Sequence, residues 1–394
     1  MIKIVQIITR LELGGSTETV LLLCKRLNPD KFKVHLIYGR SLENEFDPSG
    51  ISSYHVRALK RNISLISDWK AFAEIYRLIG KIGPDIVQTN TSKAGIIGRW
   101  AAWLYRRNHP LNKLRIIHMP HGHIFYGYGF GRARMALFKF IERITARVTD
   151  NFIAITEGEK RESLAEGIGK PGQWTVIHSD VDCRVGRVKP KNEQRTALSI
   201  PADSLVIGTV ARLEQVKGVR FFIEAAPLIV SSLQGFAPDQ NPVFLIVGDG
   251  AERKMLERLA VRLGVSDKTI FTGMRTDILD MMNALDIYVQ PSLNEGMGKT
   301  LVQAHSLNLP IVATNVQGIP DLVIDGKTGI LVPPKNPDAL ARAVCVLARD
   351  PALRKSMGKA GCAHVNRRID GLPCFSSDRM IRLLEELYES VLHD

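Results

Sequence analysis

Short apolar runs alternate with amphipathic segments along most of the 394 residues, and this alternation restricts the fold more than any other feature. Apolar runs at residues 2–8 and 85–89, for example, are followed by segments with helical spacing at 18–27 and 94–106. Strands separated by helices pair in parallel, so the pattern predicts a doubly wound α/β sheet. A chain of this length has room for two such domains.

The alternation stops at residues 183–204, a basic stretch that carries Pro190 and Pro201, and then restarts. We therefore expect a Rossmann-like domain at 1–187, a second at 188–375 and a C-terminal helix at 376–394. Ligands of parallel sheets bind at the carboxyl ends of the strands. A cleft between two domains that face each other is the expected binding site.

The formal net charge of +13 falls almost entirely in residues 1–187. A basic half suits an anionic partner such as a membrane surface, a lipid phosphate or a nucleic acid. The five cysteines are scattered and form no CxxC pair, which argues against a disulfide framework or a zinc site. No apolar run approaches the ~18 residues that span a bilayer, and no secretory leader is evident, so we expect a cytoplasmic protein.

The most informative segment follows the expected strand at 287–290 and enters a helix. It carries Glu295 at the mouth of a turn and Gln303 inside the helix. Glycines let backbone N–H groups approach a ligand, and a helix N-terminus favours a phosphate. An exposed glutamate and an ordinary helix glutamine would fit the spacing equally well. The candidate ligand-binding residues of the turn are Gly296, Met297, Gly298, Lys299 and Thr300.

Other strand ends supply further candidates. Arg212 and Lys217 follow a strand and precede a helix, where they could clamp a diphosphate or be plain surface cations. His121 follows a strand end, where it could bond a sugar hydroxyl or assist proton transfer. The remaining candidates, each in a strand-end loop, are Gly14, Gly15, Gly248, Met274 and Arg275. The Gly14-Gly15 pair is not GxGxxG, which disfavours a conventional dinucleotide site.

As a set, these motifs resemble the retaining glycosyltransferases of family 4, which have the GT-B fold. The resemblance extends from Gly14-Gly15 to about Pro351, and its strongest part is Glu295 to Gln303 followed by the segment from Ala304 to Val323. It implies that Arg212 and Lys217 hold the donor diphosphate and that Glu295 contacts the transferred sugar.

The resemblance assigns the other candidates too. It implies that Gln303 faces the ribose, that Gly15 lets its loop close on the diphosphate, and that Met274-Arg275 meets the base. His121 matches a histidine beside the sugar. The C-terminal helix is expected to pack back on the first domain. The family's favoured route is front-face attack, with no metal and no other cofactor.

Two positions depart from the family pattern. Gln303 replaces the usual second glutamate and loses a charge-assisted bond, which is worth about 1 kcal/mol and puts donor affinity in doubt. Ser179-Asp180 stands where Asn-Gly is common, so an acid there either repels the donor phosphate or forms a different turn.

The acceptor is inferred from the basic half, in which aromatic residues and cations mix at Arg99-Trp100, residues 103–107 and residues 125–140. Such a surface suits an anionic membrane and a lipid-phosphate-linked or glycan acceptor. The submotif from His121 to Tyr128, with His123, resembles bacterial members that build envelope polysaccharides. We expect a UDP-sugar donor and a peripheral location on the inner face of the membrane.

Three alternatives stay open at this point. The first is a nucleotide-sugar epimerase of the same architecture, and the second is a non-catalytic relative that binds a nucleotide-sugar or a membrane. The third is a nucleic-acid binder, although the sequence has no helix-turn-helix, RNP or zinc signature and we expect no nucleic-acid partner.

Overall fold

The computed structural model describes residues 1–12, 14–40, 46–122, 125, 131–181, 186, 188–235 and 241–393. These residues divide into two compact units. The first comprises Met1–Phe125, Phe130–Asp180 and Ser377–Asp394, and the second contains Val181–Ser376. The boundary after Asp180 lies a few residues before the expected one, and Cys183, inside the expected linker, is outside the described residues.

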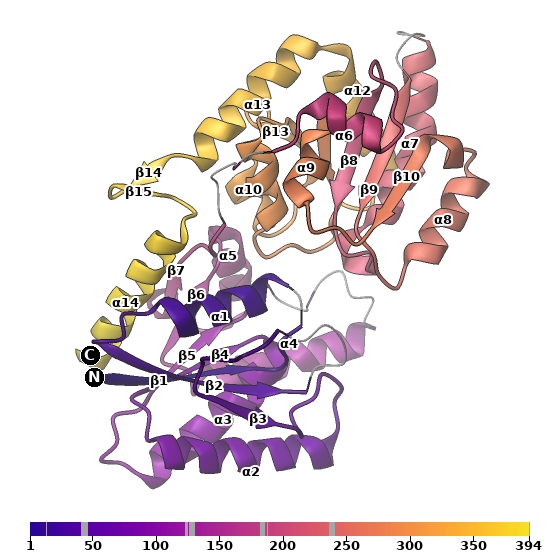
Figure 1. Cartoon of the computed structure of the whole chain (residues 1–394). Coiled ribbons are helices and arrows are strands. Elements are labelled where there is room, and N and C mark those ends of the chain that lie inside the picture. The colour runs from indigo at the N-terminus through magenta and orange to yellow at the C-terminus, as the bar shows by residue number, and fades with distance from the viewer. Residues whose placement is uncertain are drawn as a thin grey trace. The chain divides into compact units, whose positions relative to one another are not determined.

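The first unit is built on a parallel seven-stranded sheet in the order β3-β2-β1-β4-β5-β6-β7 (Figure 1). Its strands are β1 Ile2–Ile8, β2 Phe32–Gly39, β3 Ser53–Val56, β4 Ile86–Asn90, β5 Arg115–Met119, β6 Asn151–Ala154 and β7 Trp174–Val176. Its helices are α1 Gly15–Arg26, α2 Leu65–Ile82, α3 Ser92–Asn108, α4 Arg132–Ala146, α5 Glu157–Ala165 and α14 Ser377–His393.

The strands of this sheet carry apolar side chains on both faces, which is why helices cover both. Val5 and Ile7 of β1 pack with α2 and α3, whereas Ile8 packs with α1 on the opposite face. Helix α14 joins the face of α1, where Tyr388 meets the ring of Phe32 edge-on. Such two-sided burial is typical of parallel sheets.

The second unit is built on a parallel six-stranded sheet in the order β10-β9-β8-β11-β12-β13. Its strands are β8 Leu205–Val210, β9 Pro242–Val247, β10 Thr269–Gly273, β11 Ile287–Gln290, β12 Ile311–Thr314 and β13 Gly329–Val332. Its helices are α6 Lys191–Ala197, α7 Val219–Gln234, α8 Arg253–Arg262, α9 Ile278–Asn283, α10 Lys299–Ser306, α11 Ile319–Leu322, α12 Pro337–Arg349 and α13 Pro351–Val365, and a small hairpin joins β14 Arg368–Ile369 to β15 Leu372–Pro373.

Both predicted sheets are confirmed, and most element bounds agree within a few residues. Helix α14, Ser377–His393, matches the C-terminal helix expected at 376–394. The elements that were not predicted are strand β3, helices α5, α6, α11 and α13, and the hairpin of β14 and β15. The four cysteines in the described part of the chain are free thiols, and within that part no helix has the length and apolar character to cross a bilayer.

Candidate active site

Most of the candidate residues follow the carboxyl ends of neighbouring strands in the second sheet. Parallel pairing of β10, β9, β8 and β11 brings these ends to one edge. Loops that share such an edge are the usual place for a ligand. The candidates that follow these four strands are Arg212 and Lys217 after β8, Gly248 after β9, Met274 and Arg275 after β10, and Glu295 to Gln303 after β11.

Glu295 and Lys217 form the centre of this edge. The Lys217 ammonium lies 2.8 Å from Glu295 Oε2 and 3.1 Å from Oε1. Two further donors reach Oε2, the amide of Gln290 at 2.9 Å and the hydroxyl of Ser292 at 3.0 Å. The side chains of Lys217 and Glu295 are only 19% and 11% exposed, so solvent weakens this pair less than it would a surface ion pair.

A second layer of hydrogen bonds fixes the orientation of Gln290. Its Oε1 accepts from the hydroxyl of Tyr288 at 2.7 Å and from that of Thr300 at 3.2 Å. Its Nε2 must therefore face Ser292 and Glu295. Burial raises the pKa of the Tyr288 phenol, which keeps it a hydrogen-bond donor at neutral pH. Neither Gln290 nor Tyr288 was a sequence candidate, although a glutamine that ends an apolar strand is a usable signal.

Gly218 explains how two loops so far apart in sequence meet. Its φ of 64° is left-handed, and an added Cβ would lie 2.1 Å from the carbonyl oxygen of Pro291. The same two loops are joined where the Leu293 amide donates to the Val216 carbonyl at 2.8 Å. Only glycine allows this approach, which places Lys217 beside Glu295.

Arg212 lies in the same loop but has a different partner. Its guanidinium pairs with Glu214 at 3.0 Å, and its side chain is 47% exposed. The structure thus brings Lys217 and Glu295 together, while Arg212 contacts its own neighbour. The expected base-binding residues are also outward: Met274 is exposed, and Arg275 pairs with Asp277.

The turn after Glu295 leads directly into α10. Gly298 caps the helix with a left-handed φ of 79°, and Lys299 and Thr300 form its first turn. The Met297 side chain is buried, so a ligand at this turn meets backbone here. Gln303 is half-buried on the same helix. Gly248 has a packing reason of its own, because a Cβ there would lie 2.0 Å from the Ala211 carbonyl oxygen.

The remaining candidates belong to the first unit. His121 has a left-handed φ of 58°, and its Nε2 lies 3.0 Å from Asn90 Oδ1. Gly14 caps α1, and Gly15 is its first helical residue. His123 lies outside the described residues.

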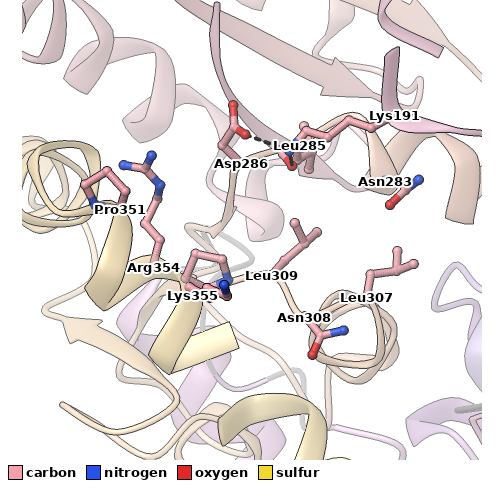
Figure 2. A pocket seen from close by; sticks show the side chains of 11 residues that line it. Lys191, Asn283, Leu285, Asp286, Leu307, Asn308, Leu309, Pro351, Arg354 and Lys355 are labelled. Carbon is pink, nitrogen blue, oxygen red and sulfur yellow. Dashed lines mark hydrogen bonds and ion pairs between the residues drawn. The ribbon is translucent and has the colours of Figure 1, made fainter. Parts of the chain in front are cut away.

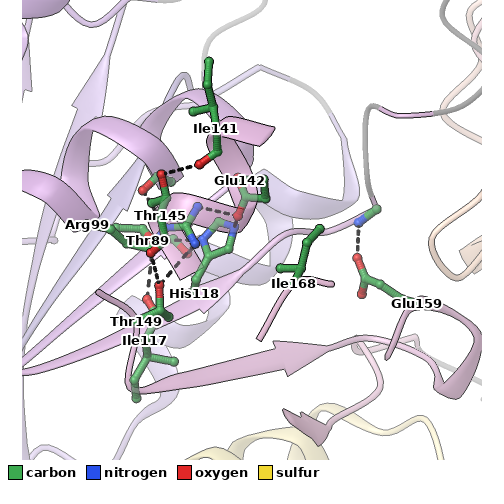
Figure 3. Close-up of polar contacts among 12 residues, drawn as sticks. Thr89, Arg99, Ile117, His118, Ile141, Glu142, Thr145, Thr149, Glu159 and Ile168 are labelled. Carbon is green, nitrogen blue, oxygen red and sulfur yellow. Dashed lines mark hydrogen bonds and ion pairs between the residues drawn. The ribbon is translucent and has the colours of Figure 1, made fainter. Parts of the chain in front are cut away.

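A buried carboxylate also holds the loop of His121, and sequence reasoning missed it. Glu159 accepts the Gly122 amide at 2.6 Å, a bond drawn in Figure 3, and also accepts the Ile155 amide at 2.8 Å. Burial raises its pKa to about 7, and the two amides only partly offset this effect. Glu159 lies in the first turn of α5, a helix that the sequence did not predict, so the sequence gave no sign of this role.

Comparison with known proteins assigns the family. The model described as Glycosyltransferase Family 4 matches residues 13–185, and the model described as Glycosyl transferases group 1 matches residues 190–364. An Escherichia coli protein named UDP-Gal:alpha-D-GlcNAc-diphosphoundecaprenol alpha-1,3-galactosyltransferase is 30% identical over 329 residues, 82% of each chain. The chain belongs to glycosyltransferase family 4.

Other relatives agree with this assignment. The Staphylococcus aureus protein named capsular polysaccharide biosynthesis glycosyltransferase CapM is 27% identical over 86% of each chain. Sucrose-phosphate synthase from Thermosynechococcus elongatus superposes with a TM-score of 0.79 at 22% identity over the whole of both chains. Anabaena HepE in complex with UDP and glucose gives 0.77 at 19% identity over 99% of this chain and 100% of its own. The fold is GT-B, the protein is a glycosyltransferase, and the epimerase alternative gains no support.

A pocket in the second unit lies at the amino ends of strands β11 and β12, the edge of the sheet opposite the candidate site. Its volume is about 250 Å³, and part of its lining comes from residues that precede β11 and β12, such as Asp286 and Leu309 (Figure 2). Burial opposes ionisation of Asp286, but the cations of Lys191 and Arg195, at 2.6 and 2.7 Å, hold its pKa below the ordinary value. This carboxylate thus neutralises nearby cations at the amino edge, away from the donor loops.

The expectation that Arg99 contributes to a basic surface is wrong. Its side chain is fully buried and pairs with Glu142 of α4 at 2.5 Å (Figure 3). It also donates to Thr149 and to the Gly95 carbonyl. A buried arginine needs such partners to offset the loss of hydration. Arg99 therefore joins α3 to α4 within the core.

Proposed function

We propose that this glycosyltransferase moves a sugar from a UDP-sugar to a hydroxyl of a lipid-linked glycan in the synthesis of a bacterial envelope polysaccharide. The observation that carries the proposal is the Lys217–Glu295 pair on the carboxyl edge of the second sheet. Its support from relatives is the E. coli protein, whose name gives UDP-Gal as donor and a diphosphoundecaprenol-linked sugar as acceptor.

The charges at this edge suit a diphosphate leaving group. Lys217 is neutralised by Glu295, and Arg212 by Glu214. A bound diphosphate would compete for both cations and for the amides at the start of α10, where the helix dipole adds positive charge. Glu295, released in part from Lys217, would then accept hydrogen bonds from hydroxyls of the transferred sugar.

The proposed reaction retains the anomeric configuration by front-face attack. The acceptor oxygen forms a bond to the anomeric carbon as the bond from that carbon to the diphosphate breaks. The acceptor proton passes to a phosphate oxygen, and UDP leaves. Arg212 and Lys217 stabilise the charge that develops on the diphosphate. We propose that these two cations supply the positive charge that a metal would bring, so activity persists in chelator.

His121 is proposed to contact the transferred sugar, and Gly14 and Gly15 to approach the diphosphate. Gly248, Met274, Arg275 and Gln303 are proposed to bind the nucleoside. An amide at position 303 can both donate to and accept from ribose hydroxyls. Replacing it by the glutamate usual in the family should tighten UDP-sugar binding severalfold, which titration of donor against the Gln303→Glu variant measures.

The first unit is proposed to bind an anionic membrane surface. Four large apolar side chains are exposed at and before the start of α2, namely Ile63, Leu65, Ile66 and Trp69. Exposed cations of Lys60, Arg61 and Lys70 flank them. Apolar and aromatic residues beside cations suit the headgroup region of an anionic bilayer. Helix α4 adds exposed Leu137 and Phe140 with Arg132 and Arg134.

Two experiments test this proposal. The first measures UDP release with a lipid-linked glycan acceptor present and absent, and reads the anomeric configuration of the product by NMR. We expect release that depends on acceptor, an unchanged anomer and no effect of EDTA, whereas an inverted product would refute front-face attack. The second is co-sedimentation with vesicles, where the wild type should bind anionic vesicles more strongly than neutral ones, and the pair Leu65→Ser and Trp69→Ser should weaken binding to the anionic vesicles. Equal binding of both lipids would refute the membrane proposal.

A further inference from the structure

Four buried polar side chains form a closed ring of hydrogen bonds beneath the loop of His121. The Tyr388 hydroxyl donates to Gln88 Oε1 at 2.6 Å, and Gln88 Nε2 donates to Asn90 Oδ1 at 3.4 Å. Asn90 Nδ2 donates to Gln6 Oε1 at 2.9 Å, and Gln6 Nε2 returns to the Tyr388 hydroxyl at 3.3 Å. All four side chains are fully buried. Strands β1 and β4 supply three of them, and the C-terminal helix α14 supplies the fourth.

The direction of this ring follows from one backbone atom. Asn90 Nδ2 lies 3.4 Å from the carbonyl oxygen of Ile7, which can only accept. A reversed ring would set the amide oxygen of Asn90 against that carbonyl, two acceptors in a dry core. The other end of the Asn90 amide, its Oδ1, therefore faces His121, and that oxygen can only accept as well.

His121 Nε2, which lies 3.0 Å from this oxygen, must therefore carry a proton. In a neutral imidazole only one nitrogen carries a proton, so Nδ1 is then the acceptor. The tautomer thus decides whether His121 Nδ1 accepts a hydrogen bond from a neighbouring group, such as a substrate hydroxyl, or donates one to it. The left-handed φ of 58° at His121 shows that the chain accepts some backbone strain to hold this residue in place.

We propose that Asn90 is a positioning residue that holds His121 in the Nε2–H tautomer, and that Tyr388 of α14 keeps Asn90 in register by closing the ring. Helix α14 is itself tied to α1 and the loop that follows it, through the ion pairs of Asp378 with Arg26 and of Glu389 with Lys31. Burial raises the pKa of Tyr388, so its hydroxyl remains a donor. The importance of the tautomer to transfer rests on the proposed role of His121 beside the sugar.

Nitrogen-15 NMR of the histidine rings in the whole chain tests the inference without any assay of activity. The spectrum of a His121→Gln variant assigns the His121 signals. We expect the wild-type neutral ring to show a single Nε2–H tautomer. An Nδ1–H tautomer, or a mixture of the two, would overturn the proposal whether or not the protein transfers a sugar.

The Asn90→Asp variant adds a second test. A carboxylate at the same distance stabilises the imidazolium, so we expect the pKa of His121 to rise by about one or more. If His121 acts in transfer, the acidic limb of the kcat/KM profile moves to higher pH with it. Asn192→Asp, at an exposed position on α6 of the second unit, is the matched control and should leave both values unchanged.

The outcomes separate the two proposals. If the pKa of His121 rises in Asn90→Asp but the pH profile of kcat/KM does not move, Asn90 positions His121 and His121 takes no part in the reaction. An unmoved pKa in a folded Asn90→Asp protein refutes the positioning role. If that variant does not fold, Tyr388→Phe, which opens the ring, should still broaden or divide the His121 signals, and an unchanged signal refutes the role of Tyr388.

Discussion

Glu159 should make the first unit less stable as the pH rises, and the size of this effect follows from its surroundings. Burial raises its pKa from 4.5 to about 7. Between these values the folded protein keeps a proton that the unfolded chain has already released. The free energy of unfolding therefore falls as pH rises through this window and levels off above it. A pKa difference of this size corresponds to about 3 kcal/mol.

Tryptophan fluorescence provides the assay, because all four tryptophans, Trp69, Trp100, Trp103 and Trp174, belong to the first unit. Urea unfolding is followed at about pH 5 and about pH 8 for the wild type and for Glu159→Gln, which cannot ionise. The glutamine satisfies one of the two backbone amides and turns its own NH2 toward the other. The variant should thus lose stability at low pH and approach the wild type at high pH.

The prediction concerns the change between the two pH values, so other titrating groups cancel. We expect the difference in unfolding free energy between wild type and Glu159→Gln to shrink by about 2.5 kcal/mol from pH 5 to pH 8, because part of the full effect already occurs below pH 5. Glu157→Gln, at an exposed position on the same helix, should track the wild type. A difference for Glu159→Gln that stays constant with pH would refute the reasoning.

Three further predictions concern packing and charge. Gly218→Ala should abolish most sugar transfer, because its Cβ would lie 2.1 Å from a backbone carbonyl oxygen of the neighbouring loop. An activity assay should show the loss of transfer, and circular dichroism should show that the variant remains folded. Arg99→Met should cost about 3–5 kcal/mol by removing the cation that pairs with buried Glu142, whereas a double variant with Glu142→Leu should recover much of it in urea unfolding. Arg212→Gln should lower kcat/KM about 100-fold, while Glu214→Gln, which removes only the ion-pair partner of Arg212, should not lower it.

The local pattern of apolar and polar residues was enough to predict the two-domain fold, but helix α13 shows where it fails. Helix α13 was missed because Gly358 and Gly361 are poor helix formers. The structure shows why they are there. A Cβ on Gly358 would lie 1.9 Å from the Asn308 carbonyl oxygen, and one on Gly361 would lie 2.1 Å from His305 Nδ1. The helix is thus favoured by close packing that no local signal contains.

Among the candidate site residues, those placed by their position after a strand were predictable, and those placed by distant partners were not. Lys217 and Glu295 were predictable because each follows a strand of a parallel sheet, which places both at one edge. The roles of Asn90 and Glu159 were not predictable. Asn90 ends strand β4 and Glu159 lies in helix α5, and each gains its role from partners about 30–80 residues away in the sequence. Arg99 misled for the same reason, since a cation next to tryptophan suggests a surface until its distant carboxylate is known.

Isothermal titration calorimetry with a panel of UDP-, GDP- and ADP-sugars tests most directly whether Lys217, beside Glu295, binds the diphosphate of a nucleotide-sugar. We expect a UDP-sugar to bind the wild type and Lys217→Gln to weaken this binding at least about tenfold by removing a charge-assisted bond. Lys359→Gln, at an exposed site on α13, should bind as tightly as the wild type. Equal affinity of Lys217→Gln and the wild type, or no binding of any sugar nucleotide in the panel, would contradict this role of Lys217.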